Sequence, residues 1–206
     1  MYARSNTLHG KPEMMDQGMA YVRDEVMPMV LGMEGCVGLS MLGDRDSGRC
    51  IVTTSWESED AMHASESGVH SSRSRAGEII GATAEVAEWA IAMMHRSRES
   101  MPGARVRVIW SGTDPGRMDD TVDAFRATML PRIEDLPGFC SLSMLTNRDM
   151  DRTVLAVTYA DAASMAAADD AAAAMRAEAG REMGMRISEV AQFDLLLAHL
   201  RVPETV

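Results

Sequence analysis

Residues 12–49, PEMMDQGMAYVRDEVMPMVLGMEGCVGLSMLGDRDSGR, lie without a gap on residues 115–152, PGRMDDTVDAFRATMLPRIEDLPGFCSLSMLTNRDMDR, after a shift of 103 residues. Identical pairs run from Pro12/Pro115 to Arg49/Arg152 and include the block Leu39–Leu42, which matches Leu142–Leu145. A period of about a hundred residues is too long for the units of a solenoid. The chain is therefore interpreted as a tandem duplication of one small domain.

The length of the chain agrees with this interpretation. At 206 residues it offers roughly a hundred residues to each copy, which is an ordinary domain size. We expect a first domain over residues 1–95, a linker over residues 96–103 and a second domain over residues 104–206. Every candidate functional residue in one domain can then be compared with its counterpart in the other.

Each copy shows the same order of predicted elements. The alternation in Arg105–Trp110, RVRVIW, is typical of a strand, and Met118, Val122, Phe125 and Met129 follow the spacing of an amphipathic helix. The predicted order is β-α-β-β-α-β, which is the plan of a ferredoxin-like domain. The predicted strands are 2–8, 36–42, 49–56, 86–94, 105–110, 139–145, 152–159 and 190–197, and the predicted helices are 14–30, 60–81, 117–133 and 162–184.

Prolines and glycines mark the end of the first helix in each copy. Pro28 and Pro131 lie near the helix ends, where a proline disfavours regular continuation, so we expect a kink or break. Gly35 and Gly138 follow, and they are consistent with a turn that needs a positive φ.

Composition excludes several classes of function. The net charge is -11, so no basic stripe is present that could neutralise nucleic-acid phosphates or anionic lipid. The small basic cluster Arg73, Arg75, Arg96 and Arg98 is interpreted as solvated surface. No apolar run reaches the length of a membrane span, and the start of the chain lacks a signal peptide, so a cytoplasmic bacterial protein is expected. Three cysteines without a CxxC pair predict neither a zinc site nor a disulfide framework.

Two short motifs resemble the antibiotic biosynthesis monooxygenase superfamily. They are Leu136–Phe139, LPGF, after the first helix of the second copy, and Thr54–Ser58, TSWES, after the third strand of the first copy. The resemblance implies an α+β fold in which two ferredoxin-like domains form a barrel, here within one chain. It leaves open a homodimer of the tandem chain. The superfamily includes cofactor-independent monooxygenases that form quinones, haem-degrading enzymes and many proteins without an assigned reaction.

The resemblance also points to site positions. An Asn on the first strand is matched by Asn6, whose counterpart in the second copy is Ile109. The Trp and the haem-ligating His of the haem-degrading branch fall on Ser65 and Ser74, so haem degradation is not expected. Other members carry two histidines after the TSWES-type motif, and these positions fall on Ser65 and His70 in the first copy and on alanines in the second.

Four residues are therefore candidates for chemistry, and all lie in the first domain. His70 is the candidate acid-base group, and Asn6 could orient a substrate oxygen. Trp56 and the Ser65 position are candidates for ligand contact. A surface histidine, an edge-strand Asn and a core Trp are the structural alternatives. No metal site is predicted, and the twenty methionines are expected mainly in the core.

Two functions remain open at this point. One is a cofactor-independent monooxygenase that acts on a small aromatic or polyketide-like substrate, with a single site in the first domain. The other is a non-catalytic ligand-binding or structural barrel, in which the polar residues were lost after duplication. A small hydrophobic or aromatic molecule is the expected partner in the first case.

Overall fold

The computed structural model describes residues 1–114 and 116–200, without the side chain of Leu200. Pro115 and residues 201–206, at the end of the predicted second domain, lie outside the described residues. Within the described ranges the chain forms two compact units. The first unit consists of residues 1–90 and 194–200, and the second unit of residues 91–193. The predicted boundaries at 95 and 104 follow the sequence repeat and stay a prediction.

Both sequence copies have the predicted β-α-β-β-α-β order. The elements of the first copy are β1 (Tyr2–His9), a 3-10 turn (Pro12–Met14), α1 (Met15–Tyr21), a π-helical turn (Val22–Val26), α2 (Met27–Leu31), β2 (Cys36–Gly43), β3 (Arg49–Trp56), α3 (Glu59–Ala64), α4 (Glu66–Ile80) and β4 (Glu85–Arg96). The elements of the second copy are β5 (Arg105–Gly112), α5 (Met118–Ala124), a π-helical turn (Phe125–Met129), α6 (Leu130–Glu134), β6 (Phe139–Asn147), β7 (Arg152–Tyr159), α7 (Ala162–Ala167), α8 (Asp169–Glu182) and β8 (Arg186–Leu200).

The strand order is that of a ferredoxin-like domain in each copy. β1 lies between β3 and β4, and β2 flanks β3 on its other side; β5 and β6 likewise flank β7. The full hydrogen-bonded order, β1-β3-β2-β8-β5-β7-β6-β4, returns to its start, which is the strand topology of a closed barrel. The predicted α+β fold of two tandem ferredoxin-like copies is confirmed.

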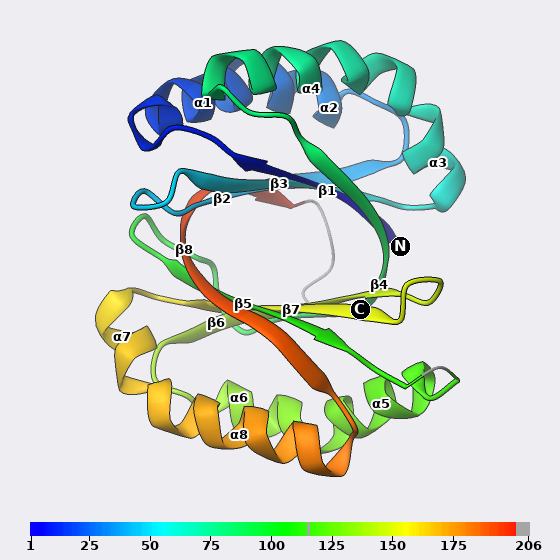
Figure 1. Cartoon of the computed structure of the whole chain (residues 1–206), viewed down its shortest axis with the longest axis vertical. Helices are drawn as coiled ribbons and strands as arrows, with labels where there is room; N and C mark the ends of the chain where they lie inside the picture. The colour runs from blue at the N-terminus through cyan, green and yellow to red at the C-terminus, as the bar shows by residue number, and fades with distance from the viewer. Residues whose placement is uncertain (115, 201–206) are drawn as a thin grey trace. The chain divides into compact units, whose positions relative to one another are not determined.

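The helices of each copy cover one face of its strands. Figure 1 shows α1, α2 and α4 against β1 to β3, and α5, α6 and α8 against β5 to β7. The predicted apolar helix faces point inward: Met15, Val22 and Val30 are at most 2% exposed, and Phe125 and Met129 are at most 3% exposed. The burial of these side chains supplies the main force that holds helix to sheet. No helix in the described ranges is both long enough and apolar enough to cross a membrane.

Of the kink or break predicted at the prolines, the break does not occur. The first helix of each copy continues past Pro28 and Pro131, and a single π-helical turn precedes each proline. Because that turn restarts the α-helical pattern, each proline lies in the first turn of α2 or α6, where its missing N–H loses no α-helical bond. The π-helical turn and the proline after it occupy equivalent positions in both copies.

The second helical segment of each copy is divided, whereas a single helix was predicted. The divisions fall at Ser65 and Ala168, which are equivalent under the 103-residue shift and buried. Each preceding short helix begins with a side-chain cap at equivalent positions: Ser58 accepts from the backbone N–H of Ala61, and Asp161 accepts from that of Ser164. The caps fix the residues at which α3 begins after β3 and α7 begins after β7.

Gly35 and Gly138 have the predicted positive φ, +72° and +68°. A Cβ atom at Gly138 would lie 2.2 Å from Cβ of Ser164, so the turn and the start of α7 meet too closely for any side chain. A pocket lies between the helices and the sheet of each copy.

Candidate functional site

An arginine on the first strand of each copy is almost completely buried. Arg4 on β1 and Arg107 on β5 are each 2% exposed, and they are equivalent under the 103-residue shift. A buried guanidinium requires partners inside the protein, because its desolvation is otherwise costly. The partners of these two arginines define the polar part of each candidate site.

In the first unit the buried arginine belongs to a fully paired network. Arg4 Nη1 lies 3.1 Å from Glu66 Oε2, and Arg4 Nη2 donates to Glu88 Oε1 at 2.7 Å. A further bond from Nη1 reaches Ser65 Oγ at 3.0 Å. Arg73 on α4 adds a second guanidinium, which donates to both carboxylate oxygens of Glu66 at 2.8 and 2.9 Å. The positive charges of the two arginines are thus balanced by the negative charges of Glu66 and Glu88.

The network lowers the pKa of Glu66. The hydrogen bond from Arg73 has the largest lowering effect, and the charges of Arg73 and Arg4 add to it. Glu66 therefore remains ionised near neutral pH and anchors both guanidinium groups. The interpretation of Arg73 as solvated surface is wrong, since its side chain is only 16% exposed and is held by Glu66.

Asn6 lies in the wall of a pocket in the first unit. Its Oδ1 accepts from Arg73 Nε at 2.8 Å, and its Nδ2 makes only a long bond, 3.4 Å, to the carbonyl of Val52. The pocket encloses about 520 Å³ of empty space, part of it open to solvent. It is lined by Arg4, Asn6, Leu8, Val22, Val26, Val30, Val52, Thr54, Val69, Ser72, Arg73 and Ala76.

The other predicted site residues lie outside this lining. The lining residues of α4 share one helical face; they are Val69, Ser72, Arg73 and Ala76. His70 follows Val69 in the sequence, does not line the pocket and is exposed. Asn6 and His70 are therefore not brought together in the pocket wall.

Trp56 and Ser65 are both buried and hydrogen-bonded to other groups of the protein. Trp56 is completely buried against Val30 and Met62, and its Nε1 donates to Thr54 Oγ1 at 3.0 Å. Ser65 is 6% exposed; its Oγ donates to the carbonyl of Met62 at 2.6 Å and accepts from Arg4. Both side chains thus take part in holding the helix layer on β1 and β3.

The second unit places its buried arginine among fewer acceptors. Arg107 pairs with Asp169 through Nη2, and its Nη1 donates to Tyr159 Oη at 3.4 Å. Its guanidinium carbon also lies 5.5 Å from the centre of the Tyr159 ring, within the range of a cation–π contact. Burial raises the pKa of Tyr159 above its ordinary value, so the phenol stays protonated near neutral pH.

Arg176 on α8 is the counterpart of Arg73, and its environment is different. Its Nη1 is buried and has no hydrogen-bond partner among the described residues. Burial, together with the neighbouring positive charge of Arg107, lowers the pKa of Arg176. An Arg pKa is so high that the group remains a cation near neutral pH. The second unit therefore holds a guanidinium with unused donor capacity.

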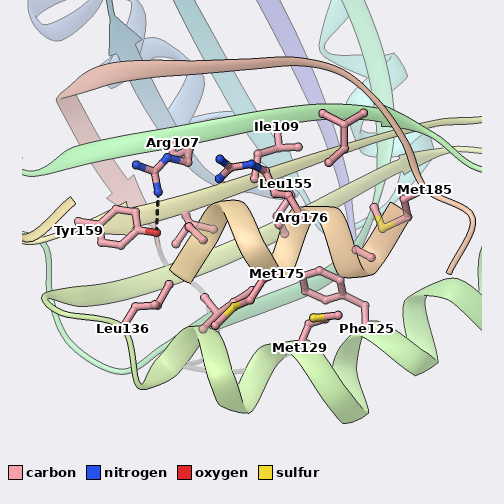
Figure 2. Close-up of a pocket in the computed structure, with 15 residues that line it drawn as sticks. Arg107, Ile109, Phe125, Met129, Leu136, Leu155, Tyr159, Met175, Arg176 and Met185 are labelled. Atoms are coloured by element: carbon pink, nitrogen blue, oxygen red, sulfur yellow. Dashed lines mark hydrogen bonds between the residues drawn. The ribbon is translucent and has the colours of Figure 1, made fainter. Parts of the chain in front are cut away.

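Arg107, Arg176 and Tyr159 all line one pocket, which Figure 2 shows between the sheet and the helices of the second unit. The pocket encloses about 550 Å³ of empty space, part of it open to solvent. Apart from these three groups its wall is apolar. It is formed by Ile109, Phe125, Met129, Ile133, Leu136, Leu155, Val157, Ala172, Met175, Ala179, Met185 and Ile187.

The sequence contains a signal for these arginines that reasoning from motifs missed. The 103-residue shift pairs Arg4 with Arg107, Glu66 with Asp169 and Arg73 with Arg176, although all of these residues lie outside the repeated block at 12–49. Extending the comparison of the two copies beyond that block would have found three charged positions kept in both.

Comparison with known proteins identifies the family. The family model described as antibiotic biosynthesis monooxygenase matches residues 1–76, the part that contains Asn6 and its pocket-lining neighbours. The first copy of the chain therefore belongs to the antibiotic biosynthesis monooxygenase family over residues 1–76.

Relatives of this chain occur in Mycobacterium tuberculosis. Uncharacterized protein Rv2557 is 44% identical over 206 residues, which is all of this chain and 92% of the relative. Uncharacterized protein Rv2558 is 42% identical over 207 residues, which is all of this chain and 88% of the relative. The relatives match the tandem chain along its whole length.

Solved structures share the fold at low sequence identity. A proposed monooxygenase from Lactobacillus acidophilus superposes with a TM-score of 0.70 at 13% identity, over 97% of this chain and 96% of that one. An anthrone oxidase-like protein gives a TM-score of 0.69 at 16% identity, over 98% of this chain and 94% of that one. At this identity the likeness establishes the fold alone.

Proposed function

We propose that the first unit is a cofactor-independent monooxygenase site for a small aromatic or polyketide-like substrate. The observation that carries the proposal is the amide of Asn6 in the wall of an otherwise mainly apolar pocket, within the segment matched by the monooxygenase family model. The family match of residues 1–76 and the anthrone oxidase-like neighbour support the choice of substrate class. A cytoplasmic location forms part of the same proposal.

The proposed reaction needs little from the protein. The methylene group of an anthrone-type substrate, which is conjugated through the two flanking rings with the ketone opposite it, loses a proton, and the resulting carbanion gives electrons to O2. One oxygen atom becomes the new carbonyl, and the other leaves as water with the two hydrogens of the methylene. The protein has to hold the substrate, stabilise the enolate oxygen and exclude bulk water.

Asn6 is the proposed group for the enolate oxygen. Among the described residues its Nδ2 makes a long bond to the carbonyl of Val52, while Arg73 fixes the amide from the other side through Oδ1. The amide is thus oriented before substrate arrives, which is the requirement for stabilising a developing negative charge. His70 is the proposed proton acceptor, although its exposed position beside Val69 gives this role less support than the role of Asn6.

Oxygen uptake with an anthrone tests the proposal. The intact chain is expected to consume O2 and form the quinone, and Asn6→Ile, which introduces the residue of the second copy, should lower the rate about a hundredfold. His9→Ala, at an exposed histidine away from the pocket lining, serves as the control and should retain the rate. An unchanged rate in Asn6→Ile would remove the assigned role, and an unchanged rate in His70→Ala would do so for His70.

Ligand binding without catalysis is the second candidate function. The pocket of the second unit favours it, because the polar side chains of its lining are two arginines and a tyrosine with a raised pKa. None of these groups exchanges a proton readily near neutral pH. Tight binding of an anthrone without oxygen uptake by the intact chain would support this function over the first.

A further inference from the structure

Three differences between the copies leave the arginines of the second unit short of acceptors. Asn6, which binds Arg73, is replaced by Ile109, and Glu66 is replaced by the shorter Asp169. The motif Glu85–Trp89, EVAEW, recurs as Glu189–Phe193, EVAQF, so that Glu88 is replaced by the neutral Gln192. Two cations then face one carboxylate instead of two.

The geometry shows where the missing negative charge belongs. Asp169 forms an ion pair with Arg107, whereas Arg176 Nη1 is buried without a hydrogen-bond partner among the described residues. Arg107, Arg176 and Tyr159 line the same pocket, and Figure 2 shows the hydrogen bond that joins Arg107 to the hydroxyl of Tyr159. A guanidinium nitrogen that is buried without a hydrogen-bond partner is costly, and a bound anion would satisfy it.

The rest of the pocket specifies the body of the ligand. Beyond the arginines and Tyr159 the wall consists of aliphatic, methionine and phenylalanine side chains, including Phe125, Met129 and Met185. A free inorganic anion would leave this surface unused, whereas an apolar body would bury it. The methionines can adapt their side chains to a flat or an aliphatic group.

We propose that the second unit holds a binding site for an amphipathic carboxylate, with the carboxylate on Arg176 and Arg107 and the apolar body between the sheet and α8. The site is separate from the one proposed for oxygenation, and its occupation requires no reaction. The second copy is therefore a binding domain of different charge preference from the first. A carboxylate matches the planar fork of a guanidinium, which can donate two parallel hydrogen bonds to it.

Calorimetric titration with two probes of the same shape tests the proposal. Naphthalene-2-carboxylate carries the charge, and naphthalene-2-carboxamide does not. The intact chain is expected to bind the carboxylate at least about tenfold more tightly than the amide, with one such site per chain. Equal affinity for the two probes would overturn the proposal, and so would the failure of the carboxylate to bind.

Substitutions locate the site. Arg176→Met keeps a long apolar side chain, removes the charge and should weaken carboxylate binding about tenfold while leaving amide binding almost unchanged. Arg181→Met, at an exposed arginine of the same helix, is the matched control and should bind like the parent chain. If Arg176→Met binds the carboxylate as tightly as Arg181→Met does, the site is not where we place it.

A reciprocal variant supplies the missing acceptors in place of removing the cation. Ile109→Asn combined with Asp169→Glu gives Arg176 the partners that hold Arg73 in the first unit. Carboxylate binding should then fall by about the same factor as in Arg176→Met, although both arginines are still present. Circular dichroism verifies that this variant folds, and Arg176→Met decides the question if it does not. A folded variant that keeps the full affinity would contradict the proposal.

Discussion

A side chain that carries a permanent charge and is withdrawn from water depends on the exact set of groups around it. Arg4 and Arg107 are equally buried, yet Arg4 contacts two carboxylates and a hydroxyl, whereas Arg107 contacts one carboxylate, a phenol and a carbonyl. Residue identity on neighbouring elements, rather than burial, distinguishes the two copies at this scale.

Asp169→Asn and Arg107→Met should have unequal effects on stability. Asp169→Asn leaves Arg107 and Arg176 without a nearby anion, so we expect a loss of about 1–3 kcal/mol in the free energy of unfolding. Arg107→Met leaves an Asp169 whose side chain is 53% exposed and can be solvated, so the loss should be smaller. Urea unfolding of both variants measures this. A larger loss in Arg107→Met would show that the packing of the arginine stem outweighs its charge.

At the scale of elements, the π-helical turn explains how two helices tolerate a proline. The turns at Val22–Val26 and Phe125–Met129 precede Pro28 and Pro131 by the same spacing, so the accommodation belongs to the duplicated unit.

Pro28→Ala should therefore change stability little. In a regular helix interior, removal of a proline would be expected to stabilise by about 3 kcal/mol. Here the N–H gained lies in the first turn of α2, so a change within about 1 kcal/mol is expected, with the same result for Pro131→Ala. Thermal unfolding of the two variants provides the measurement. A large stabilisation in either would mean that the π-helical turn does not relieve the proline.

The elements could largely be predicted from the sequence, because they depend on local pattern. Helix faces such as Met15 to Val30, and the turn at Gly138, follow from apolar spacing and backbone freedom within a few residues. The π-helical turns could not be predicted, because they accommodate a steric clash between a proline and the preceding turn of its own helix. The arginine networks also escaped prediction: Arg4 and Glu88 lie 84 residues apart and become neighbours only through the pairing of β1 with β4. Asn6 was found through the family pattern, whereas Arg176 is visible only when its partners are compared between the copies.

At the scale of the whole molecule, the balance of charge predicts how stability responds to acid. Several carboxyl groups have a lowered pKa because a guanidinium or a backbone N–H binds their ionised form; they are Asp24, Glu66, Glu88, Asp119, Asp161 and Glu178. A carboxyl group with a lowered pKa in the folded state contributes stability above its ordinary pKa, and this contribution disappears as the pH falls through the folded value.

Stability should thus decrease as the pH falls below the ordinary values of 4.5 for Glu and 3.8 for Asp. The midpoint of urea unfolding is expected to be lower at about pH 3 than at about pH 6. Most of these groups are exposed, so the difference should shrink in high salt, which screens surface pairs. A midpoint that stays constant across this range would show that the folded state gains nothing from these carboxylates.

The duplication within one chain has a consequence for how the protein can evolve. In an assembly of two identical subunits, every substitution appears in both sites at once, so a change that improves one site alters the other equally. Here position 6 and position 109 are separate codons, and an Asn can be kept at one while an Ile is fixed at the other. The tandem chain can therefore divide labour between two descendants of one ancestral pocket, a freedom that no symmetric pair of subunits has.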